Sequence, residues 1–585
     1  MLFIKNDIKK FNLSMFKKSS NCSVLIINAL LLFLNSQAQA QSDASSLLQN
    51  VESMLSRVRT APLVKHVDVA EIERQNPPSS DLKIVVTRFI FIGNSHFSDE
   101  QLHGVLEPYL ARELGFLELQ DAVKAVAMKY REMGWMAHVY LPPQEIVQGV
   151  VTVKVVEGFL GKIEFEGPLT KNSSVAQIES IFQSQDLAET PLNLKKLDYA
   201  TQISNGLSGV VVRAALKAGD EVGAVDLAIR ISDLPTLAGT IVLDNLGTSS
   251  TGSNRLGVIA NWRGLAGIGD TLGTSLISSS GSDYARLSYN LPLGHSGVRV
   301  GLSTAKAEYR SSLLETISLR GSSDIVGIEA TYPIFQQYFN SLKLSVNLDK
   351  KFFDNNNKSS NLATFESTSH YSQAGVTVTL DGWLRDRLGP GGDSFLSVAL
   401  TGGALNLTGS ANESADSKTT KTAGHFNKLR LLLTREQLLN SDLSFLTSVA
   451  AQWASKNLDG SEKLYLGGVG GVRAYPINEA GGSEGAILNF ELRRRLSADL
   501  SMAAFYDLGR VRINRDNEFQ GGALMNEFDL KGGGLSVLWQ LPLGPELKLI
   551  WARRSGINPN ASFDGNDQDG TKFVNRIWAS ANLSF

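Results

Sequence analysis

Residues 341–350 read SLKLSVNLDK. Four apolar residues alternate strictly with four polar ones along this segment: Leu342, Leu344, Val346 and Leu348 against Lys343, Ser345, Asn347 and Asp349. A period of two places the apolar side chains on one face of a β-strand and the polar side chains on the other. The segment therefore predicts a strand with one apolar and one polar face. The same pattern continues from about residue 234 onward.

The last ten residues, RIWASANLSF at 576–585, alternate in the same way, with Phe585 on the apolar face. A soluble β-sandwich would alternate too. Segments near ten residues, aromatic residues at strand ends and the export signal described below favour a membrane barrel, because only a closed barrel satisfies every backbone hydrogen bond in lipid. About 22 residues per strand and turn predict about 16 transmembrane strands and a mainly β fold. Phe585 would serve as the C-terminal assembly signal.

The N-terminal 40 residues have the features of an export signal. Five lysines precede an apolar run at 24–34, and Ala38-Gln39-Ala40 has the small-x-small pattern of a cleavage site. An apolar run of about eleven residues is too short to cross a bilayer as a helix, so we expect cleavage after Ala40. Met15 could equally be the true start. The only cysteine, Cys22, lies in this segment, so the mature chain would form no disulfide.

Residues 43–59, DASSLLQNVESMLSRVR, carry apolar residues at spacings of three and four and predict one amphipathic helix within 41–60. Residues 61–82 include Pro62, Pro77 and Pro78 and show no period, which is typical of a linker. The helix would therefore be tethered to the rest of the chain and not built into it.

Two units of similar length follow, at 83–158 and 159–233. The pattern of each unit predicts one strand, then two helices, then two strands. The elements expected in the first unit are 83–92, 98–110, 118–133, 138–141 and 150–157, with Ser98 and Gln101 forming a capping box. Those expected in the second are 162–166, 174–183, 194–207, 210–216 and 224–231. A small sheet leaves a strand edge open, and an open edge can accept an extended peptide as an added strand. The alternative is that the two units are mere spacers.

The composition excludes several function classes. The formal net charge of -2 and the pI of about 6.4 do not suggest a nucleic-acid partner. The seven histidines are scattered without metal-ligand spacing, and the Gly-rich stretches lie between β-segments, where they do not form a phosphate-binding loop before a helix. We therefore expect no catalytic residue, no cofactor and no metal.

Several motifs resemble the TpsB transporters of two-partner secretion, the haemolysin secretion/activation proteins, over nearly the whole mature chain. The element Leu141-Pro142-Pro143-Gln144 is similar to part of that family's first POTRA domain, a small periplasmic α+β module. The stretch from Asp244 to Asp270 resembles its opening barrel hairpin, and Leu291-Pro292-Leu293-Gly294 and Tyr332-Pro333 resemble its turn elements. The resemblance implies two α+β POTRA domains and a plug helix before the barrel.

Two further motifs carry the implied mechanism. Val472-Arg473-Ala474-Tyr475 resembles the tip of a long extracellular loop, around 464–484, that folds back into the barrel. Phe505, Asp507 and Gly509 resemble the wall motif that receives it, and alternation places these three side chains in the lumen. The resemblance implies that Arg473 reaches the carboxylate of Asp507. Glycine is usual at position 474: if it serves a positive φ, Ala474 would be strained, and if it serves close packing, a methyl group is tolerable.

The resemblance implies a protein of the bacterial outer membrane with POTRA domains in the periplasm. It would bind a large unfolded exoprotein, a TpsA-like adhesin or haemolysin, and carry it through the barrel to the cell surface. Besides outer-membrane lipid, its implied partners are the barrel-assembly machinery and periplasmic chaperones during biogenesis. The 41–60 helix would enter the lumen as a plug or lie free in the periplasm. The alternatives are a barrel-assembly insertase of the same superfamily and a diffusion porin.

Overall fold

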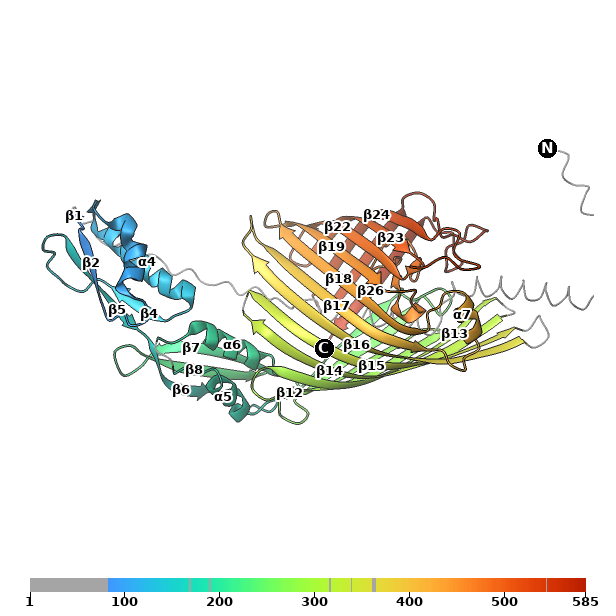
Figure 1. Ribbon diagram of the computed structural model, residues 1–585, viewed down its shortest axis with the longest axis horizontal. Coiled ribbons are helices and arrows are strands. Elements are labelled where there is room, and N and C mark those ends of the chain that lie inside the picture. Colours follow the sequence, from blue (N-terminus) through green and yellow to red (C-terminus); the bar gives the residue numbers. More distant parts are fainter. Residues whose placement is uncertain are drawn as a thin grey trace, which may run out of the picture.

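The computed structural model describes residues 83–585, apart from 168–169, 189–190, 315–316, 338, 360–364 and 543. The expected signal peptide (1–40), plug helix (41–60) and linker (61–82) lie outside the described residues. The described part forms three units in a row: two small α/β units and a large β-barrel (Figure 1). We call the small units POTRA 1 (83–158) and POTRA 2 (159–233).

POTRA 1 packs two helices on a three-stranded sheet of order β2-β5-β4. Its elements are β1 (Ile84–Val85), β2 (Arg88–Ile92), α3 (Asp99–Leu106), η3 (Glu107–Tyr109), β3 (Glu113–Leu114), α4 (Phe116–Met133), β4 (Ala137–Tyr140) and β5 (Val150–Glu157). Ser98 and Gln101 form the expected capping box at the start of α3. Helix α4 ends at Gly134, whose φ of 89° suits a residue without a side chain.

The single strand expected at 83–92 is divided in two. β1 pairs with β3, whereas β2 pairs in parallel with β5, so the chain changes partner at Val86 and Thr87. The side chain of Val86 is fully buried in the core of POTRA 1, and its carbonyl accepts a hydrogen bond from the amide of Ala111. The division is therefore caused by a tertiary contact that lies outside the local pattern.

POTRA 2 repeats the architecture with a sheet of order β6-β8-β7. Its elements are β6 (Phe159–Glu166), α5 (Val175–Gln183), α6 (Leu194–Asn205), β7 (Val210–Ala218) and β8 (Ala224–Asp233). The apolar faces of both helices and the inner sheet face form one core that includes Ile178, Phe182 and Leu227. Asn193 caps α6 by accepting hydrogen bonds from the amides of Lys195 and Lys196.

The remaining strands close into a barrel of 16 antiparallel strands, the number that the strand spacing predicts. They are β9 (Leu237–Asp244), β10 (Arg255–Arg263), β11 (Thr271–Ser278), β12 (Ser282–Leu293), β13 (Val298–Leu314), β14 (Ile317–Gln336), β15 (Asn340–Ser359), β16 (Phe365–Asp386), β17 (Gly392–Asn406), β18 (Gly424–Leu438), β19 (Leu443–Ala454), β22 (Glu484–Arg495), β23 (Leu500–Arg512), β24 (Glu527–Gln540), β25 (Pro545–Arg554) and β26 (Asn575–Ser584). The short helix α7 (Glu413–Lys418) lies in the connection from β17 to β18.

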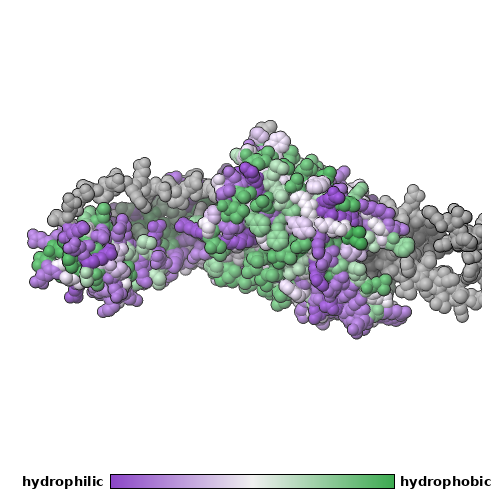
Figure 2. Space-filling model, turned by 90° about the horizontal axis from the view of Figure 1, so that it is seen from above, coloured by the Kyte–Doolittle hydropathy of each residue, from purple (hydrophilic) through white to green (hydrophobic). Residues whose placement is uncertain are grey.

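The outer surface of the barrel is apolar. Exposed leucine, valine and aromatic side chains recur at every second position, as at Leu276, Leu287, Leu348 and Tyr506. Hydrophobic residues cover much of the barrel face seen in Figure 2, and hydrophilic residues gather toward its ends. This distribution is typical of a barrel whose outer face contacts lipid. Among the helices that the structure describes, none has both the length and the apolar character needed to cross a membrane.

POTRA 2 is held against the end of the barrel that we call the foot. Within POTRA 2 and at its exit, the side-chain amide of Asn172 donates to the carbonyls of Gly209 and Leu234, each at 2.9 Å, and so fixes the position of Asn172. The amide of Gly269, in the turn between β10 and β11, donates to the carbonyl of Asn172 at 3.0 Å. Arg299 on β13 donates to the carbonyl of Gly206 at 3.1 Å. These bonds to backbone groups fix both the distance and the orientation of POTRA 2 at the foot.

Candidate functional site

The connection from β19 to β22, residues 455–483, folds into the barrel. We call it the in-folded loop. It includes η4 (Gly460–Glu462), β20 (Leu464–Tyr465) and β21 (Gly481–Gly482), and β20 pairs with β21. Leu466, Val472, Ala474 and Tyr475 are buried in one cluster with residues of the wall strands β22 to β26. The loop motif expected from the sequence therefore lies against the inner wall.

Arg473 is buried at the tip of the loop and is 4% exposed. Its Nε donates to Oδ2 of Asp507 at 2.9 Å, and its Nη2 donates to Oδ1 at 2.6 Å. The backbone amide of Arg473 donates to the same carboxylate at 3.0 Å. Its guanidinium lies over the ring of Phe505, with Cζ 3.5 Å from the ring centroid. The bidentate pair and the stacked ring together fix the guanidinium in one orientation.

Three further wall residues that the sequence did not single out hold the tip. Glu491 on β22 accepts a hydrogen bond from Nη1 of Arg473 at 2.5 Å. Asn489 donates to Asp507 and to the carbonyl of Gly471. Trp578 on β26 donates from its ring to the carbonyl of Arg473 at 2.7 Å. Asn489 and Glu491 are two residues apart, so alternation predicts that they share one face of the strand. No sequence motif, however, links them to a loop about 18 residues away.

Small residues on the wall let the tip approach. A Cβ at Gly509 would lie 2.9 Å from Cγ2 of Val472, and a Cβ at Gly532 would lie 2.4 Å from Cβ of Ala474. Ala474 does not have a positive φ; the two non-glycine residues of the loop that do are Asn478 and Ala480. The methyl group of Ala474 is therefore accommodated by Gly532 and involves no backbone strain. Of the two readings of this position, close packing is the one that the geometry supports.

The far side of the loop contacts the connection between β25 and β26. The carboxylate of Glu479 accepts hydrogen bonds from Asn558 and Asn560 and from the amide of Gln568. Asp567 in this second connection pairs with Arg554 of β25 and with Arg576 of β26. The ring of Tyr475 lies 5.4 Å below the guanidinium of Arg554. The loop is thus held on both sides by polar contacts, which can be exchanged for water or for other polar groups.

The POTRA motif closes one end of a sheet. Strand β4 stops at Tyr140, and the two prolines that follow, Pro142 and Pro143, cannot donate to the sheet. The side chain of Gln144 replaces the missing strand partner. Its Nε2 donates to the carbonyl of Thr152 on β5 at 2.8 Å, and its Oε1 accepts from the backbone amide of Thr152 at 2.7 Å. Leu141 packs against the core of POTRA 1. The motif therefore satisfies the β5 backbone where its partner strand ends.

Phe585 lies at the closure of the barrel. Its backbone amide and carbonyl both bond to Gly239 on β9, each at 2.9 Å. Its side chain is 54% exposed on the outer face. A Cβ at Gly239 would lie 2.5 Å from the Phe585 ring, so the glycine leaves room for it. Phe585 thus ends the strand that pairs with the first one, and its part in assembly stays a prediction.

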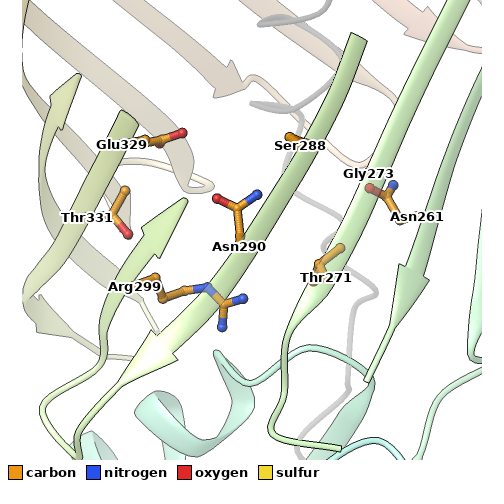
Figure 3. A pocket seen from close by; sticks show the side chains of 8 residues that line it. All are labelled: Asn261, Thr271, Gly273, Ser288, Asn290, Arg299, Glu329 and Thr331. Atoms are coloured by element: carbon orange, nitrogen blue, oxygen red, sulfur yellow. The ribbon is translucent and has the colours of Figure 1, made fainter. Parts of the chain in front are cut away.

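The lumen also contains a polar cavity of about 250 Å³ near the foot. It is lined by Asn261, Thr271, Gly273, Ser288, Asn290, Arg299, Glu329 and Thr331, which come from five consecutive strands, β10 to β14. Figure 3 shows these residues on neighbouring strands of the barrel wall. One cation and one anion balance the charge of the lining, and the other polar groups are neutral amides and hydroxyls. Arg299 belongs both to this lining and to the joint with POTRA 2.

The fold and the site together define an outer-membrane β-barrel with periplasmic POTRA domains and a loop anchored in its lumen. Residues 223–535 match the model of the haemolysin secretion/activation protein family ShlB/FhaC/HecB, and residues 84–158 match the POTRA domain of ShlB type. The family match covers more than half of the chain, so the protein belongs to this family, the TpsB transporters of two-partner secretion. Its barrel lies in the outer membrane and its POTRA domains lie in the periplasm.

Similar proteins agree with this assignment. The heme/hemopexin transporter protein HuxB of Haemophilus influenzae is 25% identical over 460 residues, which cover 76% of this chain and 79% of the relative. The outer membrane transporter CdiB of Escherichia coli is 21% identical over 463 residues, which cover 75% of this chain and 74% of the relative.

Solved structures show the fold. CdiB from Escherichia coli has a TM-score of 0.66 at 18% identity, covering 93% of this chain and 99% of that one. BamA from Haemophilus ducreyi lacking POTRA domains 1-3 has a TM-score of 0.53 at 14% identity, covering 86% of this chain and 100% of that one. The fold is therefore similar to both, and the family match is what separates the transporter from the assembly insertase.

Proposed function

We propose that this protein recognises one large, unfolded exoprotein in the periplasm through its POTRA domains and moves it through the barrel to the cell surface. The observation that carries the proposal is the in-folded loop, a lumen-filling segment attached by exchangeable polar contacts such as the pair of Arg473 and Asp507. A diffusion porin would need neither such a loop nor two POTRA domains. The relatives HuxB and CdiB are named as transporters, which supports the same reading.

The sheets of both POTRA domains offer a place for recognition. β2 and β6 are edge strands of their sheets in the described part of the chain. An extended peptide can add to such an edge through main-chain hydrogen bonds, which do not depend on its sequence. Gln144 covers the end of β5 beyond β4, so the edge of β2 is the better candidate in POTRA 1.

The polar cavity lies in the lumen near the foot, and Arg299 in its lining also bonds to POTRA 2, which supports a path from POTRA 2 into the lumen. The sequence carries no nucleotide-binding motif, so net movement would come from folding or retention of the exoprotein outside the cell. A TpsA-like adhesin or haemolysin is the expected cargo class. We also propose that the 41–60 helix plugs the resting lumen, and that the barrel-assembly machinery and periplasmic chaperones act during biogenesis.

Deleting residues 83–158 tests the recognition step. The expected result is that the cognate exoprotein no longer reaches the medium, because its first docking edge is gone. The control is the barrel itself, which should still appear in the outer membrane and still migrate faster on gels before boiling than after it. Undiminished export from a correctly inserted barrel would contradict the role of POTRA 1.

A further inference from the structure

A second carboxylate of the in-folded loop lies on a different part of the barrel wall from Asp507. Glu462 ends η4, at the start of the loop, and is 3% exposed. Its carboxylate accepts hydrogen bonds from Lys351 on β15 at 2.7 Å, from Gln373 on β16 and from Lys428 on β18. Asp507, which binds the loop tip, lies on β23. The loop is therefore attached to two separated groups of strands.

The backbone around Glu462 is held by the same wall. Arg430 on β18 donates to the carbonyl of Lys463 at 3.3 Å, and Gln452 on β19 donates to the carbonyl of Glu462 at 2.9 Å. Ser461 donates to the side chain of Gln373 at 3.2 Å. We call Lys351, Gln373, Lys428, Arg430 and Gln452 the basic pocket. In this pocket, cationic and amide side chains surround one carboxylate and its neighbouring backbone.

The charges of the basic pocket make loop withdrawal costly. Lys428 is 6% exposed, and the side chain of Lys351 is 12% exposed. Asp349 has an oxygen 3.9 Å from Nζ of Lys351, whereas Lys428 pairs with Glu462. A cation that is buried and loses its partner is strongly disfavoured. When the loop moves away, an anion in place of Glu462 would therefore compensate the charge of Lys428 better than water does.

We propose that Glu462 is a second anchor of the in-folded loop, and that the basic pocket is an anion site that takes acidic side chains of the transported chain once the loop is displaced. The proposal rests on the proposed function, because it assumes that a polypeptide passes along this wall. Glu462 is a positioning residue in the resting protein. It occupies the site that an aspartate or glutamate of the cargo takes in the open one.

Loop anchoring can be measured by thiol labelling. Because the mature chain would contain no cysteine, Leu466→Cys, which replaces a fully buried loop residue, places a single reporter in the loop. A membrane-impermeant maleimide is added to cells carrying the full-length protein. In this background Glu462→Gln should raise the labelling rate about tenfold or more, which corresponds to a change of about 1.4 kcal/mol in loop docking.

Asp381→Asn is the matched control. Asp381 is a carboxylate of β16, paired with Lys343 at 3.4 Å, and the structure describes no contact between it and the loop. Its replacement should leave the labelling rate unchanged. Adding Lys428→Met to Glu462→Gln should bring the rate back toward the starting value, because both members of the pair are then absent. Equal labelling in Glu462→Gln and Asp381→Asn would overturn the anchor.

The anion site is tested in planar bilayers with chloride as the probe. Full-length Glu462→Gln should raise the chloride-to-potassium permeability ratio at least about twofold over Asp381→Asn, because vacant cations attract anions. Adding Lys351→Gln and Lys428→Gln should abolish this rise. A ratio equal to the control, or no current from Glu462→Gln, would overturn the site. Failure of the proposed function is a separate result: the wild-type protein would not export the exoprotein.

Discussion

At the scale of single residues, the attachment of the in-folded loop depends on side-chain size as much as on charge. The tip residue Ala474 faces Gly532, and Val472 faces Gly509. In close-packed interiors, even one extra methyl group forces neighbouring atoms to move. The two glycines therefore set how near the loop can come to the wall.

A size exchange tests this contact. Gly532→Ala should impair export, because the added methyl group would lie 2.4 Å from Cβ of Ala474 and 2.9 Å from the carbonyl of Arg553. Overpacking of this kind costs about 1–3 kcal/mol. Adding Ala474→Gly should restore part of the loss, since it removes the first of the two clashes. The measurement is exoprotein in the medium per unit of inserted barrel. A double variant as impaired as Gly532→Ala alone would show that Ala474 does not make the limiting contact.

The charge of the tip is tested at Arg473. Arg473→Ala leaves the fully buried Asp507 without its cation, whereas Glu491 keeps its pair with Arg493. Breaking a buried pair in this way costs about 3–5 kcal/mol in a dry interior and less in a wet lumen. We expect export to fall about tenfold or more, and further than on deletion of 43–59. Arg473→Lys should be intermediate, because lysine cannot form the bidentate pair. Wild-type export by Arg473→Lys would show that charge alone is sufficient.

The sequence predicts some of the residues that hold the loop and not others. Arg473 and Asp507 were found because both stand in short motifs, and alternation independently placed Asp507 in the lumen. Glu491, Trp578 and Glu462 were missed, because each acts across strands that are distant in the sequence. Their only signal was a polar or aromatic side chain on a lumen-facing position, which many other residues share.

At the scale of elements, a carboxylate at the end of β5 connects this strand of POTRA 1 to the segment before α3 and to α4. Glu157 accepts hydrogen bonds from the amides of Ser95 and His96 and from the hydroxyl of Tyr130. Burial acts to raise the pKa of Glu157, but hydrogen bonds from Ser95, His96 and Tyr130 outweigh it and hold its pKa below the ordinary 4.5. The ionised form therefore favours the folded domain. This stability is present above pH 4.5 and is lost as the pH falls through the lower, folded-state pKa.

POTRA 1 should accordingly unfold more readily in urea as the pH falls below 4.5, and Glu157→Gln should reduce that pH dependence. The measurement is the fluorescence of Trp135 in the full-length protein, since the other six tryptophans lie in barrel strands. The control is Glu164→Gln on β6, outside this network. An unchanged pH dependence in Glu157→Gln would contradict the assignment.

The local pattern predicts the bounds of some elements well. β5 has the expected bounds, and α5 begins directly after the expected Ser174. The expected strand at 83–92 was wrong as a single element, because the change of partner from β3 to β5 is set by tertiary pairing. Helix α4 begins two residues before its expected start, at Phe116, since Gly115 and Glu118 form the turn that opens it.

At the scale of the whole molecule, the number of strands was predictable and their mutual placement was not. The spacing of alternating segments yields 16 strands, which the closed sheet confirms. Strand lengths in the barrel vary from 8 residues in β9 to 22 in β16, and no local pattern marks where a strand leaves the lipid. The joint between POTRA 2 and the foot depends on backbone carbonyls at Asn172, Gly206 and Gly269, which every residue type possesses.

The joint at the foot also has a consequence for the recognition step that we propose. POTRA 2 is bonded to the barrel through the carbonyl of Asn172 and through Arg299, and the barrel cannot tilt freely without exposing its apolar belt to water. POTRA 2 is therefore held at a constant distance from the bilayer and does not move freely through the periplasm. Under the proposed function, the exoprotein has to be delivered to that depth. Its binding would then depend on its concentration at the periplasmic face of the outer membrane, and not on how far POTRA 2 can extend.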